Sequence, residues 1–220
     1  MGSNYNSNQN DWKGLPIVFD EVFTGIYRLG QMSPAEMIDV KPDISAFAKI
    51  LSGGIVPLSA TLARKSFFDN FLGSEKSQAL LHGHSYTAHP IGCTVANTSM
   101  NEIKKLTSSD SWITAKKDWN SDNKSQLSWS LWSPDVVNKL STMENVDGVM
   151  ALGTLLILHL KSSGKGYESN EGQRFLSSLS KQGIHSRPLG DTVYFMTSLN
   201  TSTSSIKEIE SKIVDSLKKF

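Results

Sequence analysis

Residues 19–25, Phe-Asp-Glu-Val-Phe-Thr-Gly, and residues 48–54, Ala-Lys-Ile-Leu-Ser-Gly-Gly, decide how this chain folds. Each stretch follows or overlaps a short apolar run, 15–19 in the first case and 44–48 in the second, and such runs are typical of buried β-strands. The first run stops at Asp20-Glu21 and the second at Lys49. A third run over 58–63 completes a pattern that predicts an α/β sheet buried on both faces.

The rest of the chain predicts helices and a second, α+β unit. Helices are expected over 65–72 and over 91–106, the latter with Pro90 at its start. The composition then shifts to Ser, Lys, Asp, Asn and Trp, which indicates a partly exposed helical region ending near Pro134. Beyond it we expect a strand over 149–160, a helix over 171–182, a hairpin over 184–198 and a helix over 205–219. The predicted units are a disordered tail 1–10, a first domain 11–106 and a second domain 107–220.

Composition narrows the classes of partner. The chain has 220 residues, 38% of them hydrophobic, and 22 Lys+Arg against 21 Asp+Glu leave a formal charge of +1. Such a balance does not attract nucleic acid or an anionic membrane, so small molecules or protein are the expected partners. A lone cysteine, Cys93, favours a reducing compartment, and we expect it to pack in a core. The polar start shows no targeting segment and no apolar run can span a bilayer, which predicts a soluble protein of the cytosol or the mitochondrion.

An acid and an amine at the ends of neighbouring strands have a specific chemical use. In open α/β sheets ligands bind beyond the carboxyl ends of the strands, so Asp20 and Lys49 would face one crevice. An enzyme that uses pyridoxal phosphate needs an amine to hold the aldehyde and a carboxylate to keep the ring nitrogen protonated. Lysine suits the first task because desolvation lowers its pKa and frees the amine as a nucleophile.

The quoted stretches, with Pro42-Asp43 between them, resemble the signature block of the class III aminotransferases. The resemblance covers roughly residues 14–219 and corresponds to the C-terminal half of a typical member. It implies fold type I of the pyridoxal-phosphate transferases: part of a large domain, with a mixed and mostly parallel sheet, and a C-terminal α+β small domain. It also implies that Asp20 pairs with the pyridine nitrogen of pyridoxal 5'-phosphate, that Lys49 holds the cofactor as a Schiff base and moves the proton, and that Glu21 lies next to the ring.

Further blocks extend the resemblance. Residues 82–90 are similar to a family loop that crosses the dimer interface, which implies a homodimer in which Ser85 reaches the cofactor phosphate of the other subunit and Gly83 contacts substrate. Residues 54–62 and 186–194 resemble the branch that transfers an amino group from S-adenosylmethionine to 8-amino-7-oxononanoate in biotin biosynthesis. There Arg187 matches an arginine that binds the substrate carboxylate, a group that a guanidinium fork suits. Two positions depart from the family pattern: Tyr27 stands where glycine is usual, and residues 196–198 are Met-Thr-Ser rather than Met-Pro-Pro.

Other interpretations stay open at this point. The chain could be a truncated, catalytically inactive relative that dimerises or depends on a partner, or a separate chain could supply the other half. Three histidines near one another suggest a metal site, but no carboxylate or thiol at regular spacing completes it, and hydrogen bonding is the simpler role for His82, His84 and His89. The tryptophans at 112, 119, 129 and 132 are expected to pack between the two domains.

Overall fold

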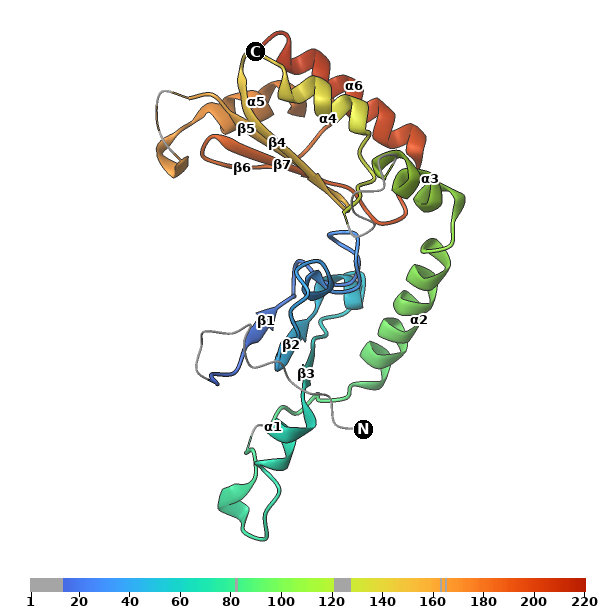
Figure 1. The fold of residues 1–220 in the computed structure, drawn as a ribbon, viewed down its shortest axis with the longest axis vertical. Helices are drawn as coiled ribbons and strands as arrows, with labels where there is room; N and C mark the ends of the chain where they lie inside the picture. Colours follow the sequence, from blue (N-terminus) through green and yellow to red (C-terminus); the bar gives the residue numbers. More distant parts are fainter. Residues whose placement is uncertain (1–13, 82, 121–127, 163, 165) are drawn as a thin grey trace.

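The computed structural model describes residues 14–81, 83–120, 128–162, 164 and 166–220, and the tail expected over 1–10 lies outside them. Two separate β-sheets are joined by one long helix along the outer side of the molecule (Figure 1). We call residues 14–106 the first lobe and residues 128–220 the second lobe. The boundary expected near residue 107 stays a prediction, although helix α2 (Pro90–Leu106) ends there.

The first lobe contains a three-stranded mixed sheet. Its strands are β1 (Val18–Asp20), β2 (Ile44–Phe47) and β3 (Ala60–Ala63), in the order β1-β2-β3. Strand β1 runs parallel to β2, and β3 runs antiparallel to β2. The three runs of the sequence therefore do form neighbouring strands, each shorter than its apolar run.

The expectation that this sheet is buried on both faces is wrong. Val18 on β1 and Leu62 on β3 are each 61% exposed. The buried side chains of β2 are Ser45 and Phe47, and Phe47 packs in a small cluster with Ile26 and Ile103. Because Ile103 comes from α2, this helix supplies much of the cover that the described residues give the sheet.

Short helical segments surround this sheet. They are η1 (Pro34–Glu36), η2 (Lys49–Leu51), α1 (Lys65–Asp69) and η3 (Lys76–Gln78), and α1 is shorter than the predicted 65–72. Helix α2 begins at Pro90 as predicted, with the His89 ring accepting the N–H of Gly92 as an N-cap. Cys93 is exposed on this helix, so its predicted place in a core is wrong: the buried face follows Gly92, Ala96 and Ile103 instead.

The second lobe contains a four-stranded antiparallel sheet. Its strands are β4 (Val146–Leu152), β5 (Leu155–Leu160), β6 (Arg187–Leu189) and β7 (Thr192–Met196), in the order β4-β5-β7-β6. The single strand predicted over 149–160 is therefore wrong. Gly153, with φ of 55°, and Thr154 form a tight turn that folds the run back on itself as a hairpin. The hairpin predicted over 184–198 is confirmed by β6 and β7.

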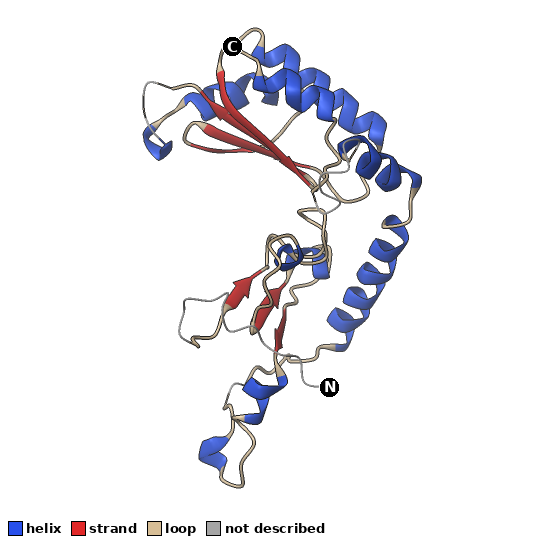
Figure 2. Cartoon of the chain, in the orientation of Figure 1, coloured by secondary structure: helices blue, strands red, loops and turns tan. Residues whose placement is uncertain are grey.

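Helices cover one face of this second sheet. Figure 2 shows α4 (Pro134–Ser141), α5 (Glu171–Ser180) and α6 (Thr203–Leu217) on the same side of it. Helix α3 (Asp110–Trp119) lies between the end of α2 and α6 (Figure 1), and η4 (Gly166–Glu168) lies in a loop. Pro134 begins helix α4 rather than ending the preceding region, because proline fits the first turn of a helix. Among the described helices, none is long and apolar enough to cross a bilayer.

The second lobe has a continuous hydrophobic core. Side chains from β5, β7 and the three covering helices meet there, and those of Leu140, Leu156, Leu158, Phe175 and Ile213 have no significant exposure. Alternate residues of β5 point to the helices, as a strand with one buried face requires.

Candidate active site

Asp20 and Lys49 lie at the same edge of the first sheet. Asp20 is the last residue of β1 and pairs in register with Ala46 of the parallel strand β2. Lys49 follows the end of β2 by two residues and begins the short helix η2. Since β1 and β2 are parallel, their carboxyl ends meet at one edge, which is where ligands bind in such sheets. The two residues thus follow neighbouring strand ends at one edge of the sheet, and the convergence of their side chains on one ligand stays a prediction.

Lys49 has an unusual backbone conformation. Its φ is 49°, in the left-handed region that residues with a Cβ rarely occupy. Strain of this kind persists where the surrounding structure enforces it, and it is common at functional sites. Ser52, held by a hydrogen bond from its hydroxyl to the carbonyl of Val56 at 2.6 Å, fixes the turn after η2. The strained residue is therefore set in a well-defined loop.

The amine of Lys49 contacts an aromatic ring from the stretch after β1. Its Nζ lies 5.0 Å from the centre of the Phe23 ring, and the guanidinium carbon of Arg28 lies 4.9 Å from the same centre. The negative face of an aromatic ring attracts cations. Within the described residues Lys49 has no ion-pair partner, so its amine is held by a ring and left available for a reaction.

Asp20 and Glu21 have opposite environments, as successive residues at a strand end do. The Asp20 carboxylate is exposed and accepts the backbone N–H of Val22 at 3.0 Å. Glu21 is 2% exposed and its side chain accepts the Ser33 hydroxyl at 2.6 Å, and its place next to a cofactor ring stays a prediction. Burial raises the pKa of Glu21; the Ser33 hydrogen bond opposes this effect and nearby Glu36 adds to it.

A cavity of about 940 Å³ brings Lys49 and Gly83 together. One wall comes from η2 and the loop leading to β3, and the other comes from the polar segment before α2. The lining residues are Ala48, Lys49, Ser52, Gly54, Val56, Pro57, Leu58, Ser59, Thr61, Gly83, His84, Tyr86, Thr87 and Ala88. Asp20, Ser85 and Arg187 do not line this cavity.

The segment before α2 is an exposed, internally bonded loop. His84 accepts the N–H of Tyr86 through Nδ1 at 3.1 Å and that of Thr87 through its carbonyl at 3.0 Å. Ser85 is exposed, and its hydroxyl makes no hydrogen bond with any residue that the structure describes. His82 falls outside the described residues, and the described ones hold no group of three potential metal ligands. The histidines at 84 and 89 act as hydrogen-bond acceptors in this loop and in the helix cap.

Arg187 lies in the other lobe. It begins β6, pairs in register with Tyr194 of β7, and its side chain is exposed. In the described part of the chain it forms no ion pair with a carboxylate. In Figure 1, β6 and β7 run along the side of the second sheet that faces the first lobe. The geometry leaves Arg187 available to bind an anion, and its substrate role stays a prediction.

Arg28 joins the lobes beside the candidate site, and analysis of the sequence gave it no role. Its side chain is buried, its Nε donates to the carbonyl of Phe23 at 3.1 Å, and its Nη1 lies 2.8 Å from the sulfur of Met196. Burial lowers the pKa of Arg28. Its own carbonyl accepts the N–H of Thr154 at 2.9 Å and the hydroxyl of the same residue at 3.2 Å. Only its place, three residues after the first quoted stretch, could have pointed to it.

Two of the four tryptophans, at 112 and 129, pack at this junction as predicted. The prediction is wrong for Trp132, which packs in the core of the second lobe, and for Trp119, whose Nε1 donates to the carbonyl of Trp132. Trp129 donates from Nε1 to the carbonyl of Gly30 at 2.8 Å, and its ring packs against Trp112, which in turn contacts Tyr27 edge-on. Gly30, with φ of 94°, is needed here because a Cβ would lie 2.9 Å from that indole nitrogen. The loop between β1 and η1 is thus fixed to the second lobe.

The two departures from the family pattern each have a structural counterpart. Tyr27 has φ of 62°, a conformation that glycine adopts without cost, and the edge contact with Trp112 helps to hold the larger residue there. Thr197 donates its backbone N–H to the carbonyl of Thr154 at 3.1 Å, a bond that a proline at this position could not make. The chain therefore accommodates both substitutions locally.

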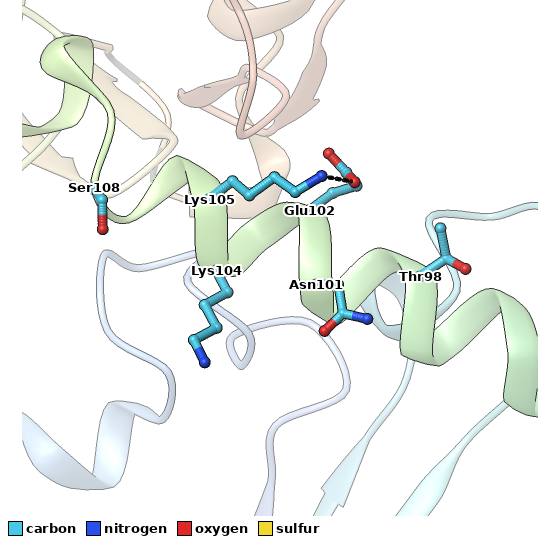
Figure 3. A pocket seen from close by; sticks show the side chains of 6 residues that line it. All are labelled: Thr98, Asn101, Glu102, Lys104, Lys105 and Ser108. Atoms are coloured by element: carbon cyan, nitrogen blue, oxygen red, sulfur yellow. Dashed lines mark hydrogen bonds and ion pairs between the residues drawn. The ribbon is translucent and has the colours of Figure 1, made fainter.

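A second pocket, on the surface of α2, lacks the reactive groups found around Lys49. Figure 3 shows Thr98, Asn101, Glu102, Lys104 and Lys105 projecting from one helix, with Ser108 just beyond its end. Lys105 and Glu102 form an exposed ion pair at 2.6 Å, which is worth little in water. This is a solvated helix surface.

Comparisons with known proteins agree with the geometry. The family model described as aminotransferase class-III matches residues 10–217. A bifunctional dethiobiotin synthetase/adenosylmethionine-8-amino-7-oxononanoate aminotransferase of Emericella nidulans is 42% identical over 213 residues, which are 94% of this chain and 27% of that protein. The adenosylmethionine-8-amino-7-oxononanoate aminotransferase of Synechococcus elongatus is 28% identical and covers 93% of this chain, with 44% of its own length matched.

Solved structures of aminotransferases share the fold of this chain over most of its length. The crystal structure of the adenosylmethionine-8-amino-7-oxononanoate aminotransferase from Methanocaldococcus jannaschii superposes with a TM-score of 0.74 at 25% identity, over 92% of this chain and 45% of that one. An amine transaminase from an uncultivated Pseudomonas species, described as PLP-bound, superposes with a TM-score of 0.75 at 22% identity, which shows the shared fold. This chain spans less than half the length of each of these relatives.

Proposed function

Because this chain belongs to the class III aminotransferases, we propose that it takes part in transferring an amino group from S-adenosylmethionine to 8-amino-7-oxononanoate in biotin biosynthesis. The relatives from Emericella nidulans and Synechococcus elongatus carry this activity in their names. In this proposal the chain is the C-terminal half of fold type I, with residues 11–106 as part of the large domain and 107–220 as the small domain.

One observation carries the proposal: an available amine and an exposed carboxylate at the carboxyl ends of two neighbouring parallel strands. Lys49 and Asp20 fit pyridoxal 5'-phosphate at two of its contacts, and the unbonded hydroxyl of Ser85 fits a third, the phosphate. When bound, this cofactor supplies an electron sink. Asp20 would hold a proton on the ring nitrogen, and the Nζ of Lys49 would bind the aldehyde and later carry a proton to and from the substrate.

Two further residues would bind substrate. Arg187 offers an unpaired guanidinium whose fork matches a carboxylate, and the backbone of Gly83 lies in the same cavity as Lys49. Ser85 would serve the neighbouring subunit of a homodimer, so each site would need two copies of the chain. For the compartment we propose the cytosol or the mitochondrion, since a relative from Arabidopsis thaliana is named as mitochondrial.

The first test is covalent trapping. The purified chain is mixed with pyridoxal 5'-phosphate, reduced with borohydride and mapped by mass spectrometry; the label is expected on Lys49. Lys49→Ala should lose it, whereas Lys65→Ala, which alters an exposed lysine paired with Asp69, should keep it. Equal labelling of many surface lysines in the wild type and in Lys49→Ala would refute the assignment of Lys49.

A second candidate function rests on the exposed apolar side chains of the first lobe. Val18, Leu62 and Phe68 are each more than 60% exposed, which is unusual for the sheet and helix of a self-contained domain, and Leu72 just beyond α1 is exposed to a similar degree. They favour a catalytically inactive relative that acts as a dimerising or partner-dependent fragment. An assay for diaminopelargonate formation by the chain alone separates the candidates: product supports the transaminase, and Lys49 labelling without product supports the fragment.

A further inference from the structure

Glu21 is a buried carboxyl for which the proposed chemistry has no use. It is 2% exposed, Oε1 accepts the hydroxyl of Ser33 at 2.6 Å, and Oε2 has no partner among the residues that the structure describes. A charged carboxylate with one open oxygen is costly to bury, so the side chain must contribute something that offsets this cost.

The side chain of Glu21 closes a loop. Its backbone extends the ladder between β1 and β2, with its N–H donating to the carbonyl of Ala46 at 3.0 Å, and its carbonyl accepts the N–H of Gly25 at 3.0 Å. Ser33, at the other end, is the N-cap of η1 and accepts the N–H of Ala35 at 3.2 Å. The Glu21–Ser33 hydrogen bond therefore ties the end of β1 to the start of η1 and closes residues 21–33 into a loop.

This loop carries the aromatic ring that the Lys49 amine contacts. Phe23, whose ring lies 5.0 Å from Nζ of Lys49, falls between the two hydrogen-bonded residues Glu21 and Gly25. Val22, in the same turn, donates to the Asp20 carboxylate. Moving this turn would shift the Phe23 ring relative to the Lys49 amine. It would also shift the Val22 N–H that donates to the Asp20 carboxylate.

We propose that Glu21 and Ser33 form a clasp that sets Phe23 against the Lys49 amine, which makes Glu21 a positioning residue of the site. The clasp itself follows from contacts within the loop. Its consequence for cofactor binding rests on the proposed function of Lys49.

Ionisation of Glu21 should destabilise the loop over 21–33, because the cost of burying the charge outweighs the stronger hydrogen bond that the Ser33 hydroxyl donates to a carboxylate. Ser33 and Glu36 face Glu21 from η1, and no cation forms an ion pair with it within the described chain. The neutral carboxyl is therefore the form that suits the folded loop, and the raised pKa agrees with this. The stabilisation is complete at low pH and is lost as the pH rises through the folded-state pKa of Glu21.

Hydrogen exchange of the amides over 22–32 tests the clasp without any cofactor. After division by the intrinsic rate at each pH, wild-type exchange should speed up as the pH rises, whereas Glu21→Gln, which is neutral at every pH, should stay flat. Glu21→Ala and Ser33→Ala should exchange faster throughout, by roughly fivefold to tenfold for one lost buried hydrogen bond. Glu210→Gln is the matched control, because Glu210 is an equally buried carboxyl in the other lobe, bonded to the N–H of Ser133.

Borohydride trapping of pyridoxal 5'-phosphate on Lys49 tests the positioning step. The Glu21→Gln variant should label at the wild-type rate at low pH and faster than the wild type at high pH, and Glu21→Ala should label several-fold more slowly. Unchanged exchange over 22–32 in Glu21→Ala and Ser33→Ala would overturn the clasp, and identical pH responses of exchange in wild type and Glu21→Gln would overturn its pH dependence. If the Glu21 variants alter exchange but leave Lys49 labelling unaltered, the positioning role is overturned. If wild-type Lys49 is not labelled at all, the proposed function fails, and the exchange result alone decides the clasp.

Discussion

The two lobes differ in how completely they bury their own apolar side chains. In the second lobe Leu156, Leu158 and Val193 are fully buried beneath α4, α5 and α6. In the first lobe the buried cluster around Phe47 is small, and Val18 and Leu62 lie open on the outer strands. Since apolar burial is the main favourable term in folding, the second lobe holds most of the stability of the chain.

This difference matters because the candidate site lies in the less buried lobe. Lys49 and Asp20 are positioned by a three-stranded sheet with little cover of its own among the described residues. Two hydrogen bonds connect the loop over 21–33 to the second lobe. Thr154 donates to the carbonyl of Arg28, and Trp129 donates to the carbonyl of Gly30. The well-packed second lobe thus supports the lobe that carries the candidate site.

The largest expected difference in stability is between two leucine-to-alanine substitutions, one in each lobe. Leu158→Ala removes a side chain with 0% exposure from the second core and should lower the free energy of unfolding by about 2–5 kcal/mol. Leu62→Ala removes the same atoms from a side chain that is 61% exposed and should cost no more than about 0.5 kcal/mol. Urea unfolding followed by tryptophan fluorescence measures both.

Equal losses for the two leucine variants would show that something covers β3 in solution. A dilution series separates the causes: a cost of Leu62→Ala that fades as the protein is diluted would indicate a second copy over this strand. A large cost that does not depend on concentration would contradict the contrast between the lobes.

A substitution at the junction between the lobes should have an intermediate effect on stability. Trp129→Phe keeps a ring against Trp112 but leaves the buried carbonyl of Gly30 without its donor, a loss of about 1–3 kcal/mol. Because this bond joins the lobes, exchange of the amides over 24–32 should rise more than exchange in β5. The control is Trp119→Phe, which removes an indole bond to the carbonyl of Trp132 outside the loop over 21–33. A rise in exchange over 24–32 in both variants alike would mean that this bond does not hold the lobes together.

Local patterns were enough to predict much of the fold. Pro90 at the start of α2, the strand ends at Asp20 and near Lys49, and the hairpin around Gly190 all follow from residues close together in sequence. Their physical causes are local as well: a fixed φ, an apolar run that stops, a glycine that permits a turn. The turn at Gly153 had the same kind of signal, but the long apolar run around it favoured one strand.

Burial and the junction could not be predicted in this way because they depend on distant residues. The bond between Thr154 and the carbonyl of Arg28 spans 126 positions, and that between Trp129 and Gly30 spans 99. No period in the sequence links such residues. The same holds for Glu21: an Asp-Glu pair at a strand end does not indicate which carboxyl turns outward and which is enclosed by Ser33.

The smallest expected effect on stability comes from Asp191, a buried carboxyl that holds a loop of the second lobe as Glu21 holds one in the first. The two differ in their preferred charge state: the folded protein favours the neutral form of Glu21 and the charged form of Asp191. Its Oδ2 accepts the N–H of Gly166 at 3.1 Å, and its Oδ1 lies 3.3 Å from Nε2 of His159. Burial acts to raise the pKa of Asp191, but the Gly166 and His159 contacts outweigh it and lower the pKa below the usual 3.8.

A lowered pKa means that this stabilisation is present above the unfolded-state pKa and is lost as the pH falls through the folded-state value. Asp191→Asn should therefore lower the free energy of unfolding by about 1 kcal/mol at neutral pH, and the gap to wild type should close in acid. Urea midpoints measured at several pH values follow that gap. Asp147→Asn is the control, because Asp147 contacts the same imidazole from an exposed position, 3.4 Å from Nδ1, and should change little. A gap that stays constant into acid would show that Asp191 acts through shape alone, and the two lobes would then not differ in how their buried carboxyls respond to pH.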